Sequence, residues 1–283
     1  YSMDNGNMNL VTPGVHGTAG NRVESATALA TYLRATIHLG DFTLTPGLRN
    51  EKIAFERNDF GSSDVDRLGD GDYRINDVSV LLPGLGLNYN VSSSLDVFAG
   101  IHRGFIPPGS RPETNPELSI NSELGLRFSH KYISSQLVVF SNNYSNLLGA
   151  DLNASGGTGS GDLYNGGSAL ANGIEFELAV DPFTDGPFDH LSMPIRLAYT
   201  FTDATFTNAF ESDLGAWGDV ELGDELPYLA PHQLSIITSF EHKKLAIDIS
   251  GRYTSAMRTV AGQGDLLSST STDSSIIFDS GIR

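Results

Sequence analysis

The sequence contains no cysteine, few charged residues and no long apolar run, and each absence excludes a class of protein. Without cysteine, disulfide frameworks and Cys-ligated metal sites are excluded. No segment approaches the roughly 18 consecutive apolar residues that a membrane-spanning helix needs. A basic start followed by an apolar stretch, which would mark a secretion signal, is also absent from these 283 residues.

Positive charge is scarce as well: 17 Lys and Arg stand against 34 Asp and Glu, a formal net charge of −17. Nucleic acid is not expected as a partner, because phosphate binding needs clustered Lys and Arg. The acidic residues gather between apolar segments, as in 59–72 and 211–225, and this placement is typical of solvated loops. A calcium site is the alternative for the first run, which lacks the spacing and the closing Glu of a calcium loop.

Apolar residues recur at every second position along most of the chain. Residues 195–202 alternate Ile, Leu, Tyr and Phe with Arg, Ala and Thr, and residues 174–180 and 245–253 follow the same pattern. Successive side chains of a strand point to opposite faces, so each segment has one apolar and one polar face. We expect strands near 25–39, 41–58, 75–91, 94–107, 117–130, 132–148, 168–181, 193–209, 229–242, 244–259 and 275–283.

The lengths of these strands and of their connections favour a membrane barrel over a soluble sandwich. Most exceed the five or six residues usual in soluble sheets and reach the roughly nine to eleven that a spanning strand needs. Short turns alternate with long loops, as in outer-membrane barrels, which have short periplasmic turns and long external loops. Turns are expected near 40–41, 91–93, 130–131 and 242–243, and loops near 59–74, 108–116, 149–167, 210–228 and 260–274. The connection at 181–192 is the exception, because it is long at a place where the alternation predicts a short turn.

The predicted fold class is therefore all-β, an antiparallel transmembrane β-barrel in which residues 1–283 form a partial barrel domain. About eleven strands are counted, and an open sheet would leave unpaired N–H and C=O groups in hydrocarbon at several kcal/mol each. We expect the remaining strands to come from the rest of a longer chain or from another polypeptide.

Several stretches resemble the barrel of TonB-dependent outer-membrane receptors, particularly the ferric-citrate-receptor-like branch. GIHRGFIPPG at 100–109 resembles a strand that rises into a loop, and PELSINSELGLRF at 116–128 resembles the strand start that follows it in the family. Four further segments extend the resemblance in the correct order: TLTPGLRNE at 43–51, FSNNYSNLLGADLNASGGTGSGDLYNGG at 140–167, GDELPYLAPHQLS at 223–235 and MRTVAGQG at 257–264.

The resemblance implies a receptor in the Gram-negative outer membrane that imports a scarce solute, expected to be a ferric chelate of siderophore or citrate type. It implies a barrel of about twenty-two strands, filled by an N-terminal plug that contacts TonB, and neither plug nor contact segment is recognised in this sequence. Outer-membrane lipid and lipopolysaccharide are further expected partners. The alternative is a passive outer-membrane porin, which would have no plug.

No enzymatic activity, cofactor or metal is expected. The seven His are dispersed without ligand spacing, and the Gly-rich run 156–161 is followed by neither Lys-Ser/Thr nor a helix. An enzyme or adhesin barrel was the third possibility, but the sequence has no nucleophile elbow that would anchor catalysis.

Three arginines are the candidate ligand-binding residues. Arg103 and Arg111 flank the proline-rich loop after Phe105, and Arg258 lies at another strand top. Guanidinium groups bind carboxylates in a bidentate way, as an anionic iron chelate would require. The alternative role for each is loop anchoring through pairing with nearby carboxylates.

Other charged residues are predicted to point into the barrel. Glu123 and Arg127 lie four apart on one strand face, where they can bond to a plug or to a neighbouring strand. Arg196, Asp248 and Arg252 have the same inward phase, since a charge facing mid-bilayer lipid costs roughly 2–4 kcal/mol for Arg or Lys.

Overall fold

The computed structural model describes residues 2–4, 7–9, 21–61, 64, 66–112, 114–150, 163–183, 191–212 and 216–283. All regular elements in these ranges are β-strands. Within the same ranges, no helix is long and apolar enough to cross a membrane.

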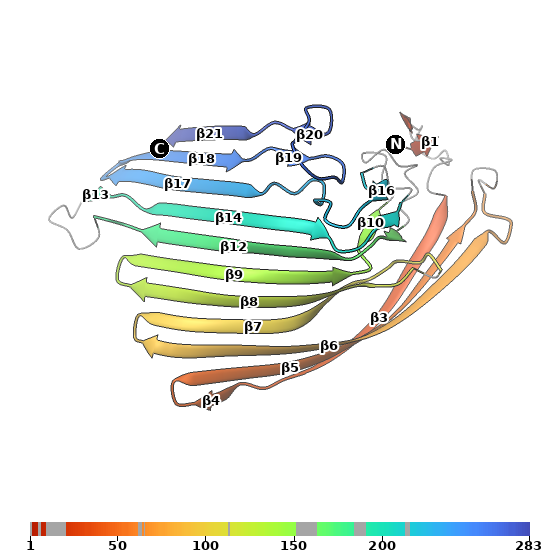
Figure 1. Ribbon diagram of the computed structural model, residues 1–283, viewed down its shortest axis with the longest axis horizontal. Helices are drawn as coiled ribbons and strands as arrows, with labels where there is room; N and C mark the ends of the chain where they lie inside the picture. Colours follow the sequence, from red (N-terminus) through yellow and green to blue (C-terminus); the bar gives the residue numbers. More distant parts are fainter. Residues whose placement is uncertain are drawn as a thin grey trace.

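One antiparallel sheet of thirteen strands forms the body of the molecule (Figure 1). Eleven strands follow one another in sequence order, with β3 and β21 at the two edges. They are β3 (Arg22–Arg34), β5 (Phe42–Asp59), β6 (Asp72–Ser92), β7 (Leu95–Ile106), β8 (Glu117–His130), β9 (Ile133–Ser145), β12 (Ala169–Val180), β14 (Ile195–Phe206), β17 (His232–His242), β18 (Leu245–Thr254) and β21 (Ser275–Ile282). Two short strands join them, β4 (Ile37–Leu39) beside β5 and β13 (Leu191–Ser192) beside β17.

Four two-stranded pieces lie outside this sheet. They are β1 (Ser2–Asp4) with β2 (Asn7–Asn9), β10 (Leu148–Ala150) with β11 (Leu163–Asn165), β15 (Phe210–Glu211) with β16 (Asp219–Val220), and β19 (Met257–Arg258) with β20 (Ser271–Thr272).

All eleven predicted strands are present, and the differences occur at their ends. β17 begins at His232 and not at residue 229, because Pro231 precedes it and has no N–H for the ladder. β9 ends at Ser145, just before Asn146 turns the backbone to a φ of 54°. The predicted strand 25–39 is divided into β3 and β4 where Ala35 faces Pro46, which accepts a hydrogen bond from the Ala35 N–H but returns none.

The strand register separates two faces of the sheet. Directly paired residues point to the same side, so Leu124 shares a face with Ala99 on β7 and Val139 on β9, while Glu123 shares the other face with Gly100 and Phe140. Along β6 the apolar-face positions from Leu81 to Leu87 are exposed and the alternate positions are half-buried. Over the lower part of these strands one face is therefore apolar and the other is a mixed polar surface.

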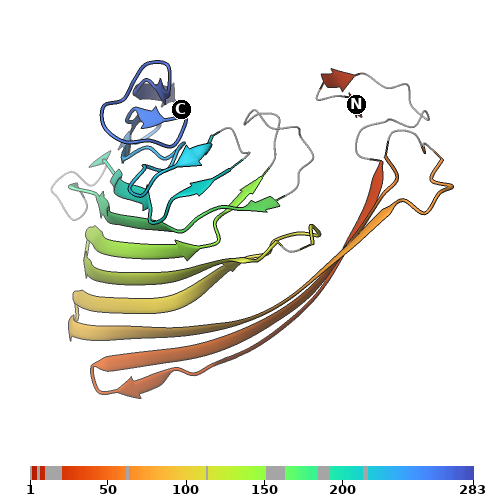
Figure 2. The same cartoon turned by 45° about the vertical axis from the view of Figure 1, so that its right-hand side comes forward.

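The polar face is the concave one. Leu163, in the connection between β9 and β12, lines one cavity together with Glu24 of β3 and Arg57 of β5. On a flat sheet β3 and β9 would lie about 24 Å apart, five strand spacings. The sheet curves instead into a trough (Figure 2), and the polar face is the inner face of that trough.

The β5–β6 hairpin rises above the rest of the wall. β5 has 18 residues and β6 has 21. The eight other strands that follow them along the main path of the sheet, from β7 to β21, have between 8 and 14 residues. The outward side chains of β5 are apolar from Phe42 to Leu48 and then become Asn50 and Lys52. The upper half of the hairpin therefore extends beyond the apolar part of its outward face.

Candidate functional site

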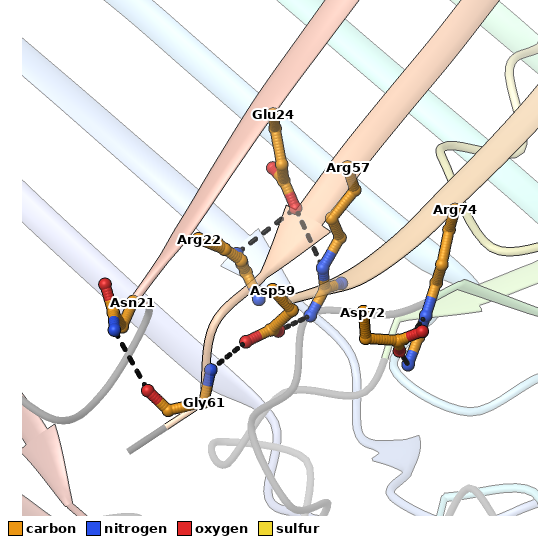
Figure 3. Close-up of polar contacts among 8 residues, drawn as sticks. All are labelled: Asn21, Arg22, Glu24, Arg57, Asp59, Gly61, Asp72 and Arg74. Carbon is orange, nitrogen blue, oxygen red and sulfur yellow. Dashed lines mark hydrogen bonds and ion pairs between the residues drawn. The ribbon is translucent and has the colours of Figure 1, made fainter. Parts of the chain in front are cut away.

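The inner face at the upper end of β3, β5 and β6 carries two rows of charged side chains, which we call the inner rim (Figure 3). The register aligns one positive and two negative residues in the upper row and one negative and two positive residues in the lower row. The upper row consists of Arg22, Asp59 and Asp72, and the lower row consists of Glu24, Arg57 and Arg74.

Ion pairs connect the rows of the inner rim. Arg57 Nη2 lies 2.7 Å from Asp59 and its Nε lies 3.6 Å from Glu24, which in turn is 3.1 Å from Arg22 Nε. Arg74 Nη2 lies 2.7 Å from Asp72. Arg57 is only 6% exposed, so its charge is held where solvent screens it little.

Asp59 illustrates how the rim balances burial against charge. Burial acts to raise the pKa of this carboxyl, but a hydrogen bond from Arg57, a second from the Gly61 N–H at 3.0 Å, and the charges of Arg57 and Arg22 together lower it. Asn21 extends the network, because its amide donates to the Gly61 carbonyl at 3.0 Å. The rim is thus fixed to the hairpin connection above it.

Asn76 on β6 holds the loop between β7 and β8 against this inner face. Its Nδ2 lies within hydrogen-bond distance of three loop carbonyls, at 3.1 Å from Gly109, 3.0 Å from Arg111 and 3.1 Å from Thr114, so its two N–H groups are shared among the three. Gly109 adopts a φ of 73°, a conformation that favours glycine, and the preceding Pro108 is fully buried. The proline-rich loop therefore folds inward, and the Asn76 amide holds it on the side of the sheet.

The next connection braces the same loop from its other side. The Asn115 N–H donates to Asn165 Oδ1 at 2.8 Å, and Asn165 Nδ2 donates back to the Asn115 carbonyl at 2.9 Å. Glu117 accepts from the Leu148 N–H at 3.0 Å. Burial raises the pKa of Glu117, and the Leu148 hydrogen bond offsets part of this shift.

A cavity of about 340 Å³ lies between the inner rim and the inward loop. Glu24, Phe55 and Arg57 line it from the sheet, residues 108–111 line it from the loop, and Leu163 lines it from the next connection. Guanidinium and carboxylate groups lie beside an aromatic ring there, so the cavity can hold a small polar or anionic group.

The three predicted arginines do not form one cluster. Arg111 lines the rim cavity. Arg103 pairs with Ile120 on β8 and so lies on the outward apolar face, with its Nη1 3.4 Å from the Leu81 carbonyl. Arg103 therefore lies on the opposite face of the wall from Arg111, since side chains two residues apart on β7 share a face and Ile101 is outward, and its role as a ligand contact stays a prediction.

Arg258 belongs to a separate loop cluster. It is 6% exposed, its Nε lies 2.8 Å from Glu225 Oε2, and its Nη2 donates to the Gly264 carbonyl. These contacts join the loop after β18 to the loop before β17. Arg258 thus has the geometry of its alternative role, in which it anchors loops by pairing with a nearby carboxylate.

The predicted inward charges share the inner face. The register pairs Glu123 with Gly100, Arg127 with Asp96, and Arg196 with Ala179, all of inward phase. Arg127 donates to Gln136 at 3.0 Å and lies 4.9 Å from the centre of the Phe98 ring, which covers Gly125. Asp248 and Arg252 are inward as well. In the ranges that the structure describes, no group of three His, Asp or Glu side chains could hold a metal ion.

Sequence reasoning missed Arg57 and Asn76, the two residues that organise the site. The inward phase of Arg57 could be found from the alternation in 41–58. No sequence signal distinguishes Asn76, because its three partners lie 33 to 38 residues away.

The fold agrees with that of known proteins. A family described as TonB dependent receptor-like, beta-barrel, matches residues 1–283. The unliganded ferric citrate transporter FecA aligns with a TM-score of 0.70 at 18% identity, covering 92% of this chain and 38% of that one.

Two other solved structures give similar values. The siderophore receptor PiuA from Acinetobacter baumannii has a TM-score of 0.70 at 14% identity, and the alignment covers 93% of this chain and 37% of PiuA. The ferric yersiniabactin uptake receptor FyuA from Yersinia pestis has a TM-score of 0.63 at 20% identity, with 92% and 38% covered. This chain thus spans less than two fifths of the solved proteins it resembles. No curated protein sequence matches it. The family match over its whole length nevertheless means that this chain belongs to the TonB-dependent receptor-like β-barrels.

Proposed function

We propose that this chain is part of an outer-membrane receptor that imports a ferric chelate of siderophore or citrate type. In this proposal residues 1–283 are a partial barrel domain, completed by further strands and filled by a plug that contacts TonB. The observation that carries the proposal is the inner rim, a charged and partly buried surface beneath an inward loop, in a chain of a receptor family. Ferric citrate, siderophore and ferric yersiniabactin proteins among its structural neighbours support the choice of solute.

The rim cavity is the proposed contact for the anionic groups of the chelate. Arg111 lies on the inward loop and Arg57 lies on the wall opposite, so two guanidinium groups line one cavity. Arg57 forms ion pairs with Glu24 and Asp59, so its proposed role is to hold these charged groups in place on the wall of the cavity. Arg111 is the proposed ligand contact, because guanidinium binds carboxylate or catecholate oxygen with charge-assisted hydrogen bonds.

Growth and uptake under iron limitation test this function. A strain without the gene, complemented with the full-length protein, is supplied with a panel of iron-loaded citrate, hydroxamate and catecholate chelates, and uptake of labelled iron is measured. We expect one chelate class to be taken up only when the protein and an energised TonB system are both present. Equal uptake of every chelate with and without the protein would contradict the proposal, and uptake independent of TonB would favour a porin.

The R111Q variant tests the assigned contact. We expect the half-saturating chelate concentration to rise about tenfold, as for the loss of one charged hydrogen bond, with maximal uptake little changed. The R252Q variant is the control, since Arg252 shares the inner face but lies on β18, far along the sheet. Unchanged half-saturation in R111Q would remove Arg111 from the site.

A further inference from the structure

Glu117 is a buried carboxylate without a cation. It is the first residue of β8 and is only 6% exposed. In the described part of the chain its hydrogen-bond donor is the Leu148 N–H of β10, at 3.0 Å, and no Lys, Arg or His pairs with it. Glutamate is seldom buried unless it is paired, because the charged form loses its hydration. Each carboxylate of the inner rim has an arginine partner, whereas Glu117 has a backbone N–H alone.

Glu117 lies where the start of β8 meets the connection between β9 and β12. Leu148 of β10 is directly paired with Asn165 of β11, and Asn165 exchanges two hydrogen bonds with Asn115. Asn115 and Glu117, two residues apart, therefore hold the same rung of the β10–β11 pair. Leu163, two residues before Asn165, lines the rim cavity. The position of that side of the cavity thus depends on this rung.

The groups around Glu117 do not balance its charge. The titratable group that faces it is the phenol of Tyr144 on β9, and phenols are neutral near pH 7. Ile106, its direct partner on β7, is apolar. Tyr144 also packs against the apolar cluster around Phe206. Ionised Glu117 therefore loses hydration without gaining an opposite charge, which costs free energy.

We infer that Glu117 is a proton-sensitive positioning residue for the rim cavity, an inference that rests on the function proposed for that cavity. While the carboxyl is protonated, β10 and β11 stay against the start of β8. When it is ionised, release of Leu148 lets water reach the carboxylate. The brace that Asn165 provides to the loop carrying Arg111 then loosens, and the proposed chelate contact is held less firmly.

The direction of the effect follows from burial. Burial raises the pKa of the Glu117 carboxyl above its ordinary value of 4.5, and the Leu148 N–H offsets part of this shift. A carboxyl whose pKa is higher in the closed arrangement stabilises that arrangement fully below the ordinary value. This contribution is lost as the pH rises through the raised value. We therefore expect mildly acidic surroundings to hold the rim cavity most firmly.

Amide protection in the full-length receptor, in lipid nanodiscs and without any chelate, tests this positioning role. Exchange relative to an unfolded peptide at the same pH is measured for the Leu148 and Asn165 segments between about pH 4 and about pH 8. We expect wild-type protection to fall at least about threefold across this range. E117Q should stay protected throughout, because its amide oxygen accepts the same hydrogen bond without a charge, and E117A should be weakly protected throughout. E211Q changes an exposed carboxylate of β15 and should follow the wild type.

Chelate affinity then connects the rung to the site. The ratio of half-saturating concentrations, wild type to E117Q, cancels the protonation of the chelate itself. It should be about threefold near pH 7.5 and fall to about one near pH 4.5. Wild-type protection that does not change with pH would overturn the inference, as would E117Q protection that follows the wild type, or a ratio of one at every pH. Because amide protection is measured without a chelate, its failure leaves the uptake proposal intact, and failure of uptake leaves the protection result intact.

Discussion

The upper end of the trough is organised in two different ways along the sheet. Near β12 and β14 the loops surround an apolar core of Ala169, Phe206 and Val220, against which Trp217 and Phe210 pack edge-on. Near β3 to β6 the strand tops are joined by ion pairs, and the loops are held by hydrogen bonds such as those of Asn76 and Asn165. The side chains of the apolar core pack against one another, whereas the region near β3 to β6 contains a cavity lined by charged side chains. The comparison indicates that one region supports the loops and the other is available to a ligand.

Removing the apolar core should produce the largest change. F206A deletes a fully buried ring and should weaken local stability by about 3–5 kcal/mol, the usual cost of a buried Phe→Ala change. Hydrogen exchange should then increase in residues 205–226, while residues 72–80 of β6, the strand that carries Asp72 and Arg74 of the inner rim, keep their protection. Equal loss of protection in both regions would show that they are one unit.

Removing the amide of Asn76 should release the inward loop without disturbing the apolar core. N76A leaves three loop carbonyls without their donor, at a cost of about 1–3 kcal/mol. We expect proteases to cut within 107–112 at least about tenfold faster, with no new cut near Trp217. N88A is the matched control, since Asn88 lies on the same strand and donates only to Asn90 among the hydrogen bonds described. Unchanged cleavage in N76A would contradict the anchoring role.

Acidification should weaken the inner rim, and this effect should be smaller than those of F206A and N76A on their own regions. The pKa of Asp59 is lowered below its ordinary value of 3.8, so its contribution to stability is complete above that value and is lost as the pH falls through the lower folded value. The protection factor of the Gly61 amide, which is its exchange relative to an unfolded peptide at the same pH, should fall below about pH 4 in the wild type. D59N should show a low protection factor at every pH, and a wild type whose protection factor follows that of D59N throughout would remove Asp59 from the network.

Most of the wall could be predicted from the sequence, because alternation determines both the presence of a strand and the face of each side chain. The inward phases of Glu123, Arg196 and Arg252 follow from it directly. Strand ends were less predictable, since they depend on local features such as Pro231 and Asn146.

The site was predicted only in part. The proline-rich loop identifies Arg111, which lines the rim cavity, whereas Arg103 just before that loop has an outward phase on β7 that its place beside the loop does not reveal. The contacts of Asn76 depend on how the loop after β7 returns to the sheet, and alternation carries no information about that. Alternation gives the inward phase of Arg57, but its ion pair with Glu24 depends on the register of β3 against β5. The predicted loop segments at 151–162 and 184–190 lie outside the described residues.

The two-faced wall is the central claim, and spin-label accessibility along β8 tests it most directly. The 283 residues contain no cysteine, so labels can be attached at single cysteines introduced in turn at residues 123 to 127 of the receptor in lipid bilayers. We expect oxygen, which partitions into lipid, to reach labels at Leu124 and Leu126, and a polar nickel reagent to reach labels at Glu123 and Arg127. Uniform accessibility along the strand, or the reverse phase, would contradict the account.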